Sequence, residues 1–132
     1  DTSGLLLLTD NGQCNHVLTS PKHLVPKVYL ATLAERASTT LCDQLLAGVL
    51  LKDESEILAA QSCRLLEPNR VEVTITQGKY HQVRRMLVAA GNHVQALTRI
   101  SIGNLDLPEN LAPGQWQWLD AVQMQRAGWY PR

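Results

Sequence analysis

The sequence predicts an α+β fold with a mixed, largely antiparallel central sheet flanked by helices. Two observations support this class: strand-like segments outnumber helical ones, and neighbouring strand patterns are joined by hairpin-type turns. A third observation indicates the number of domains: the chain has 132 residues, of which 45% are apolar, and this is enough to form one hydrophobic core. We therefore expect residues 1–132 to form a single domain.

The chain opens with strand and helix patterns in alternation. Residues 4–9 hold a continuous apolar run before the turn signal at residues 10–12, which predicts a buried strand whose leucines belong to the core. Residues 13–18 predict a short helix. Residues 27–33 alternate in polarity and predict a strand with both faces partly buried. A helix follows the potential N-cap at residues 38–40.

The second half begins with a predicted hairpin. Residues 61–66 and 70–76 are strand-like, and the Glu-Pro-Asn turn at residues 67–69 joins them. A helix is then expected to open at Gly78, because apolar side chains recur at helical spacing: Val83, Met86, Leu87 and Ala90. Residues 94–102 predict a further strand.

The C-terminal region predicts two more elements. Residues 116–119 resemble a last short strand, and Asp120 could cap a final short helix. Three tryptophans in this region, Trp116, Trp118 and Trp129, could form a stacking platform, but packing in the core or at an edge is the more common role for such residues.

Composition excludes several classes of protein. The apolar content excludes a disordered chain, and no apolar run is long enough to span a membrane. The 12 basic and 12 acidic residues exclude a uniformly basic nucleic-acid binder. The three cysteines form no CxxC pair, so neither a zinc knuckle nor a disulfide framework is supported, and their use indicates an intracellular protein. No metal or cofactor motif is present.

The zero net charge nevertheless hides a partition along the chain. Residues 64–99 are basic, with Arg64, Arg70, Lys79, Arg84, Arg85 and Arg99 against Glu67 and Glu72. Residues 11–34 carry Lys22 and Lys27 and no acid, whereas residues 35–63 are acidic. This pattern could place a basic face beside an acidic back, and such a face attracts polyanions. Ordinary solvated surface charge is the equally good alternative.

Residues 78–86 carry the most chemistry. This GKYHQVRRM segment places Lys79, His81, Gln82, Arg84 and Arg85 around the predicted start of a helix, where free backbone N–H groups favour phosphate. Taken alone, the segment could be no more than a basic helix start.

Three segments together resemble one known family. They are residues 1–12 (DTSGLLLLTDNG), 27–29 (KVY) and 78–86, and the similarity continues through residues 91–94, 97–103 and 111–114. The chain resembles the catalytic domain of RNA pseudouridine synthases of the RsuA-like group. Residues 15–23, followed by KVY, look most like the enzyme of the small ribosomal subunit.

The resemblance implies a reaction and a partner. These enzymes isomerise a uridine in RNA to pseudouridine by C–N cleavage, base rotation and C–C bond formation, without metal or cofactor. The uridine must leave its stack to be reached. The implied partner is ribosomal RNA, as 16S rRNA or a small-subunit particle, with 23S rRNA as the alternative substrate. The implied compartment is the bacterial cytoplasm.

The resemblance also assigns site residues. Tyr29 matches the tyrosine expected to stack on the flipped base, and Arg84 matches the basic residue that pairs with the essential aspartate. In the family this aspartate belongs to an Arg-Leu-Asp segment, two residues before the position of Asp1. The N-terminal part of the fold is thus expected upstream, as is the S4-like RNA-binding domain that is common in the family. A non-catalytic RNA-binding fragment is the alternative function.

The remaining assignments are less specific. The turn that carries the aspartate is expected to include Asp1, Thr2, Ser3 and Gly4. The candidates for phosphate contact are Lys22, His23, Lys27, Lys79, His81, Arg85 and Arg99. Gln82 is expected to pack or to cap.

Overall fold

The computed structural model describes residues 2–20, 23–79 and 81–130. Its elements in chain order are β1 (Thr2–Gly4), α1 (Gly12–Thr19), β2 (Lys27–Leu33), α2 (Leu41–Ala47), β3 (Val49–Leu50), β4 (Ile57–Leu58), β5 (Ser62–Glu67), β6 (Arg70–Ile75), α3 (Gln82–Ala89), β7 (Val94–Ile102), β8 (Leu105–Asp106) and α4 (Ala121–Ala127). No helix in these ranges is long and apolar enough to cross a membrane.

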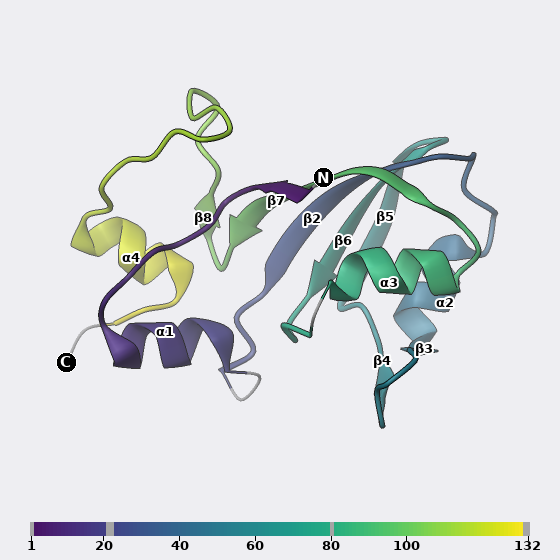
Figure 1. Ribbon diagram of the computed structural model, residues 1–132, viewed down its shortest axis with the longest axis horizontal. Coiled ribbons are helices and arrows are strands. Elements are labelled where there is room, and N and C mark those ends of the chain that lie inside the picture. The colour runs from purple at the N-terminus through teal and green to yellow at the C-terminus, as the bar shows by residue number, and fades with distance from the viewer. Residues whose placement is uncertain (1, 21–22, 80, 131–132) are drawn as a thin grey trace.

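A six-stranded sheet organises the molecule (Figure 1). Its strand order is β1-β7-β2-β6-β5, and β8 pairs with β7. Strand β1 runs parallel to β7, and the other pairs are antiparallel. The predicted class, a mixed and largely antiparallel sheet with helices around it, is confirmed. The short strands β3 and β4 form a separate hairpin.

One face of the sheet packs against α2 and α3. Alternate residues of β2 and β6 point to this face, as the period of two in a strand requires. Fully buried side chains there include Ala31, Val73 and Met86. We call this group the sheet cluster; its buried members are Ala31, Leu33, Leu41, Leu45, Leu51, Leu58, Ala60, Val71, Val73, Ile75, Val83, Met86, Leu87 and Leu97.

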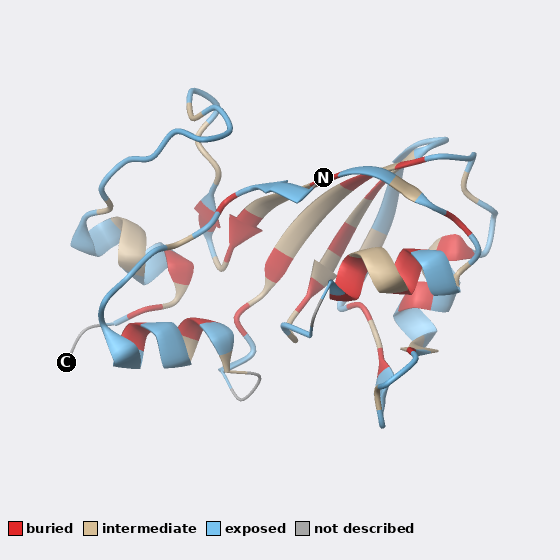
Figure 2. Ribbon diagram, in the orientation of Figure 1, coloured by how far each residue is buried: buried red, intermediate tan, exposed pale blue. Residues whose placement is uncertain are grey.

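A second apolar group lies at the other end of the molecule, where α1 and α4 meet the end of β7 and β8 (Figure 2). We call it the helix cluster, and its buried members are Leu5, Cys14, Leu18, Val25, Ile102, Leu105, Ala127 and Trp129. Side-chain caps define where its helices begin. Asn11 accepts from the Cys14 amide at 3.0 Å, and Asp120 forms a capping box with Gln123, as its predicted role requires.

The predicted strand over residues 4–9 is wrong. Strand β1 ends at Gly4, and beyond it one more backbone bond joins the Leu5 amide to the Arg99 carbonyl at 2.9 Å. The next residues lack a partner strand, so nothing holds them in a sheet. Leu5 is buried, but Leu6 and Leu8 are 68% and 85% exposed, so the run is core only in part.

Two predictions near the other helices also need correction. Residues 116–119 form no strand, and Trp116 and Trp118 are exposed with their rings packed edge to face, 5.4 Å between centroids. Of the three tryptophans, Trp129 is the buried one. Helix α3 begins at Gln82 rather than at Gly78, because His81 adopts a left-handed conformation (φ 46°) that a helix cannot include.

Candidate functional site

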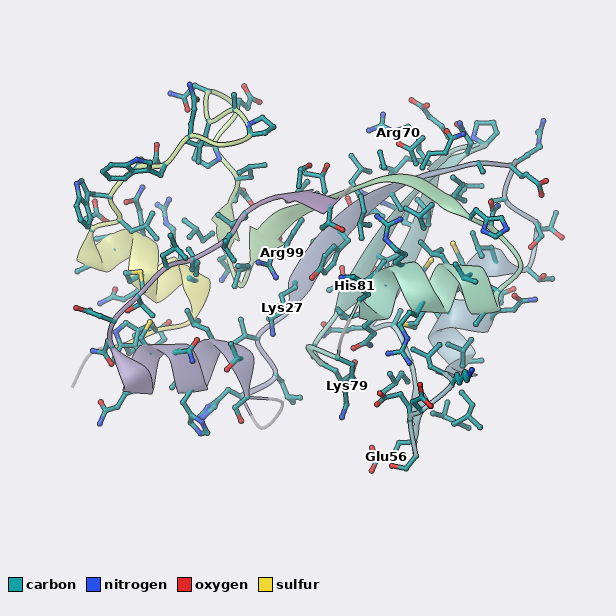
Figure 3. All side chains as sticks on the ribbon, viewed as in Figure 1. Lys27, Glu56, Arg70, Lys79, His81 and Arg99 are labelled. Carbon is teal, nitrogen blue, oxygen red and sulfur yellow. The ribbon has the colours of Figure 1, made fainter. Side chains whose placement is uncertain are left out.

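A cavity of about 320 Å³ opens between the sheet and the N-terminal end of α3. Four strands and two helices contribute to its lining: β1, β2, β6 and β7, the end of α1 and the start of α3. The described residues that line it are Thr2, Thr19, Lys27, Tyr29, Ile75, Gly78, Lys79, His81, Gln82, Val83, Arg84, Leu97 and Arg99. In Figure 3, Lys27, Arg99 and His81 lie between the start of β2 and the start of α3.

Tyr29 and Arg99 form one wall of the cavity. They are direct partners on β2 and β7, so their side chains lie on the same face of the sheet. Arg99 Nη1 donates to Tyr29 Oη at 3.4 Å, and the guanidinium carbon lies 6.0 Å from the ring centroid. Arg99 Nε also donates to the Leu5 carbonyl at 2.7 Å. These contacts hold the tyrosine ring at the cavity.

Arg84 joins three elements at another edge of the cavity. It projects from α3, where Nη1 donates to the Val94 carbonyl at 3.2 Å and Nη2 approaches Thr2 Oγ1 at 3.5 Å. The first contact reaches β7 and the second reaches β1. The guanidinium therefore sits directly beside the start of the chain's first strand.

Lys27 lies deep in the same cavity. The residue is 7% exposed, and its Nζ is buried without a hydrogen-bond partner among the described residues. Burial lowers the pKa of this ammonium, and the positive charge of Arg99 lowers it further. Because Lys27 and Tyr29 are two residues apart on one strand, their side chains point to the same face.

The loop before α3 is fixed by Gln82. This side chain is 2% exposed, accepts from the Lys79 amide at 3.3 Å and donates to Gln77 Oε1 at 3.1 Å. Its predicted role in packing or capping is confirmed. The loop thereby presents Lys79 and His81 at the cavity, although both precede the helix.

The acidic segment does not lie on a separate back of the molecule. Glu54 pairs with Lys79 at 3.6 Å and with Arg85 at 3.8 Å. Acidic and basic segments are thus in contact next to α3. Arg85 contacts Glu54 and the Lys52 carbonyl and does not line the cavity. The simple division into a basic face and an acidic back is wrong here.

The structure brings together most of the residues singled out in the sequence, seven of which line the cavity: Thr2, Lys27, Tyr29, Lys79, His81, Arg84 and Arg99. His23 is elsewhere, packed edge to face on His16 at 5.9 Å beside a second cavity of about 260 Å³. Asp1 and Lys22 lie outside the described residues.

The predicted turn over Thr2, Ser3 and Gly4 is wrong: these residues form strand β1, whose pairing with β7 extends them, and only Thr2 of the three lines the cavity. Ser3 Oγ lies 3.1 Å from Thr98 Oγ1 on β7. Gly4 has φ +99°, and a Cβ at this position would stand 2.4 Å from the Arg99 carbonyl oxygen. A side chain here would push β1 away from β7, so glycine is required for the close approach.

Sequence reasoning missed some lining residues. Thr19, at the end of α1, had no pattern that could have marked it. Leu97 and Ile75 were predicted as strand residues, but their place at the cavity depends on which strands pair. In the described ranges, no group of three or more His, Cys, Asp or Glu side chains could hold a metal ion.

The cavity can accommodate a planar, negatively charged ligand. It offers one aromatic ring, apolar walls from Ile75, Val83 and Leu97, and four cationic side chains. None of its described lining residues is acidic. Aromatic rings with cations are the combination that proteins use to hold an unstacked base and its phosphates.

Comparison with known proteins identifies the family. The model of a family described as RNA pseudouridylate synthase matches residues 1–89. The chain belongs to this family. The resemblance stated from the sequence is thereby confirmed.

Curated relatives and a solved structure agree with the family assignment. The ribosomal small subunit pseudouridine synthase A of Yersinia pestis is 41% identical over 128 residues, which are 97% of this chain and 54% of that protein. The protein of the same name from Escherichia coli K12 is 42% identical over 89% of this chain and 51% of its own length. A crystal structure of a pseudouridylate synthase matches with a TM-score of 0.91 and 40% identity, covering 96% of this chain and 55% of that one.

The coverage values show how much of each relative the chain corresponds to. It spans about half the length of the curated relatives that it matches. Within that half, the TM-score of 0.91 shows that the chain has the fold of the solved pseudouridylate synthase.

Proposed function

We propose that the protein to which this chain belongs isomerises a uridine of ribosomal RNA to pseudouridine, and that the chain is part of its catalytic domain. One observation carries the proposal: Tyr29 and Arg84, which match functional positions of the family, line one cavity although they are far apart in the sequence. Family membership supports the same conclusion.

The reaction can be written with all atoms balanced. The bond between C1′ of the ribose and N1 of uracil breaks, and its electron pair leaves with the base. The base then turns, and C5 forms a bond to C1′. The C5 proton is lost, N1 acquires a proton, and the overall formula does not change.

In this proposal Tyr29 stacks on the flipped base. Stacking on an aromatic side chain contributes roughly 1–3 kcal/mol per base. The bond from Arg99 to Tyr29 Oη supports this role because it restricts the ring at the cavity wall. The apolar side chains Ile75 and Leu97 would shield the base from water.

Arg84 would act through the family's essential aspartate. The resemblance puts that aspartate a few residues before Thr2, and the contact between Arg84 and Thr2 lies at the same end of β1. A neighbouring guanidinium keeps a carboxylate ionised at neutral pH. The carboxylate would then be ready to act on the ribose or the base.

The names of the curated relatives favour small-subunit RNA as the substrate. We therefore propose 16S rRNA, either free or in a small-subunit particle, with 23S rRNA as the alternative. The cations at the cavity would hold the phosphates beside the target, and loss of one phosphate contact weakens binding without changing sequence preference. Such a substrate would place the activity in the cytoplasm.

The decisive experiment uses the full-length protein and rRNA tritiated at C5 of uridine. Isomerisation replaces the C5–H bond, so pseudouridine formation releases tritium into water. We expect release from 16S rRNA or the particle, and a decrease of at least about 100-fold in the single-turnover rate for Arg84→Met, because a charge next to the reacting groups is lost. RNA affinity should change by less than about threefold, because Arg84 is proposed to act on the aspartate during the reaction and not to bind an RNA phosphate.

Arg64→Met is the matched control. Arg64 is 67% exposed and pairs with Glu72 on the surface hairpin, away from the cavity. It should release tritium at the wild-type rate. If the wild-type protein binds rRNA but releases no tritium from 16S or 23S rRNA, the binding-only alternative is correct.

A further inference from the structure

The buried ammonium of Lys27 is the feature that the proposed roles leave unexplained. Its Nζ has no hydrogen-bond partner within the part of the chain that the structure describes, and the residue is 7% exposed. An ammonium group taken out of water normally gains an acceptor or an anion, because burial without one is strongly unfavourable. The fold alone therefore does not account for a lysine at this position.

Other cations at the cavity have acceptors within the protein. Arg84 donates to the Val94 carbonyl, Arg99 donates to the Leu5 carbonyl, and Lys79 pairs with Glu54. Lys27 has no such acceptor and lies close enough to Arg99 to feel its charge. In the proposed function the aspartate pairs with Arg84. Lys27 and Arg99, with no carboxylate among the described lining residues, then form a site for an oxygen anion supplied by the ligand.

We propose that the Lys27 ammonium binds a uracil oxygen of the target uridine and stabilises the base while it is detached from the ribose. This inference rests on the proposed function. When the C1′–N1 bond breaks, its electron pair leaves with uracil, and the negative charge spreads over N1 and the ring carbonyl oxygens. Lys27 donates a hydrogen bond to that charge and keeps its own proton. The contact ends when C5 bonds to C1′ and the charge is lost.

The position of Lys27 favours the base over a backbone phosphate as the source of that oxygen. Lys27 and Tyr29 share a face of β2 and are separated by two residues, about 7 Å along a strand. A base stacked on Tyr29 therefore comes within reach of a lysine side chain. The RNA backbone must enter and leave the cavity at its rim, where Lys79 has a side chain that is 52% exposed.

The first test is Lys27→Met in the full-length protein, with single-turnover tritium release from 16S rRNA. We expect the rate to fall at least about 100-fold, as when one donor to a developing oxyanion is removed. The dissociation constant for the RNA should change by less than about threefold. The thermal midpoint of the free protein should rise by about 2–5 °C, because an unpaired buried charge is removed. A structural role would instead lower that midpoint.

Lys52→Met is the matched control, because Lys52 is exposed in a turn that does not line the cavity. It should leave the rate and the thermal midpoint unchanged. Lys27→Arg keeps the charge and should retain more activity than Lys27→Met. If Lys27→Met fails to fold, this arginine variant and Lys27→Gln supply the comparison of rates.

A second measurement separates a base oxygen from a phosphate oxygen. After the modified uridine has been mapped with wild-type protein, each phosphate flanking it is replaced by a neutral methylphosphonate in a synthetic RNA. If Lys27 acts on the base, Lys27→Met remains about 100-fold slower than wild type on these RNAs. If it binds a phosphate, the replacement slows wild type and abolishes the difference between the two proteins.

The outcomes distinguish this inference from the proposed function. Tritium release by wild type together with a full wild-type rate for Lys27→Met overturns the role of Lys27 alone. A loss confined to RNA affinity, or an effect abolished by methylphosphonate, also overturns it. Absence of tritium release from every rRNA by wild type overturns the proposed function and this inference together.

Discussion

The two apolar clusters differ in how their residues are held. The sheet cluster is built mostly from regular elements, with only Leu51 and Ala60 of its buried members outside them, and many of its side chains are completely inaccessible, as Leu33, Leu45 and Leu87 show. The helix cluster depends in part on irregular chain, with Leu5 and Trp129 outside helices and strands. Exposed Leu6 and Leu8 adjoin it. Tight packing is thus concentrated beneath α3, next to the cavity.

This difference explains where the cavity can form. Sheet-cluster residues Ile75, Val83 and Leu97 provide its rigid walls, whereas Thr19 of α1 closes it from the side of the helix cluster. A catalytic arrangement requires supporting side chains with fixed positions. Tyr29 and Arg84, the residues that we propose to stack on the base and to pair with the aspartate, both project from elements of the sheet cluster.

The largest effect on stability is expected in the sheet cluster. Leu87 is fully buried beneath α3, so Leu87→Ala removes packing and leaves a cavity that rigid neighbours cannot fill. We expect a loss of about 3 kcal/mol or more in the free energy of unfolding. Urea denaturation of the full-length protein, followed by circular dichroism, measures this loss. A loss below about 1 kcal/mol would show that α3 can collapse onto the sheet.

A smaller effect is expected in the helix cluster. Leu18 is 6% exposed on α1 and contacts a region bordered by irregular chain. Leu18→Ala should reduce the free energy of unfolding by about 2 kcal/mol, the lower end for such substitutions, because the surroundings can relax. The same urea experiment provides the comparison. Equal losses for Leu18→Ala and Leu87→Ala would show that the two clusters are equally rigid.

Sequence patterns predicted the sheet cluster better than the helix cluster. Strands β2 and β7 were expected where they occur, because their alternating patterns are local signals. The four leucines at residues 5–8 give no such information, since a continuous apolar run has no period. Which of them is buried depends on the end of the β1–β7 pairing, a tertiary feature.

The same limit applies to the site. The resemblance supplied Tyr29 and Arg84, and residue chemistry supplied the list of cations, but only the strand pairing shows that Tyr29 and Arg99 are neighbours. The proximity of Cys42 on α2 to Cys63 on β5, whose sulfur atoms lie 3.0 Å apart, was likewise not predictable, because the two residues are far apart in the sequence. Pairing between distant segments is absent from local periodicity, so these relations required the structure.

The pH dependence of stability provides the smallest and most specific test, because it isolates one group at the edge of the sheet cluster. The pKa of Lys27 is lowered from its ordinary 10.5, chiefly by burial and then by Arg99. Below the pKa that Lys27 has in the folded protein, Lys27 is charged in both the folded and the unfolded protein. The full free-energy cost of burying the charge then destabilises the folded protein. Between that pKa and 10.5 the unfolded chain binds more protons, so stability rises with pH.

Lys27→Met should therefore be more stable than wild type at neutral pH, and this advantage should shrink as the pH rises toward 10.5. The other groups facing the ammonium are present in both proteins and largely cancel in the difference: Tyr29 on β2, Arg99 on β7, and Lys79, His81 and Arg84 at the start of α3. Urea denaturation at a series of pH values measures the difference. An advantage that does not vary with pH would mean that the Lys27 charge is not its cause. A saturating RNA ligand should reverse the advantage at neutral pH, since the bound oxygen supplies the acceptor that the free fold lacks.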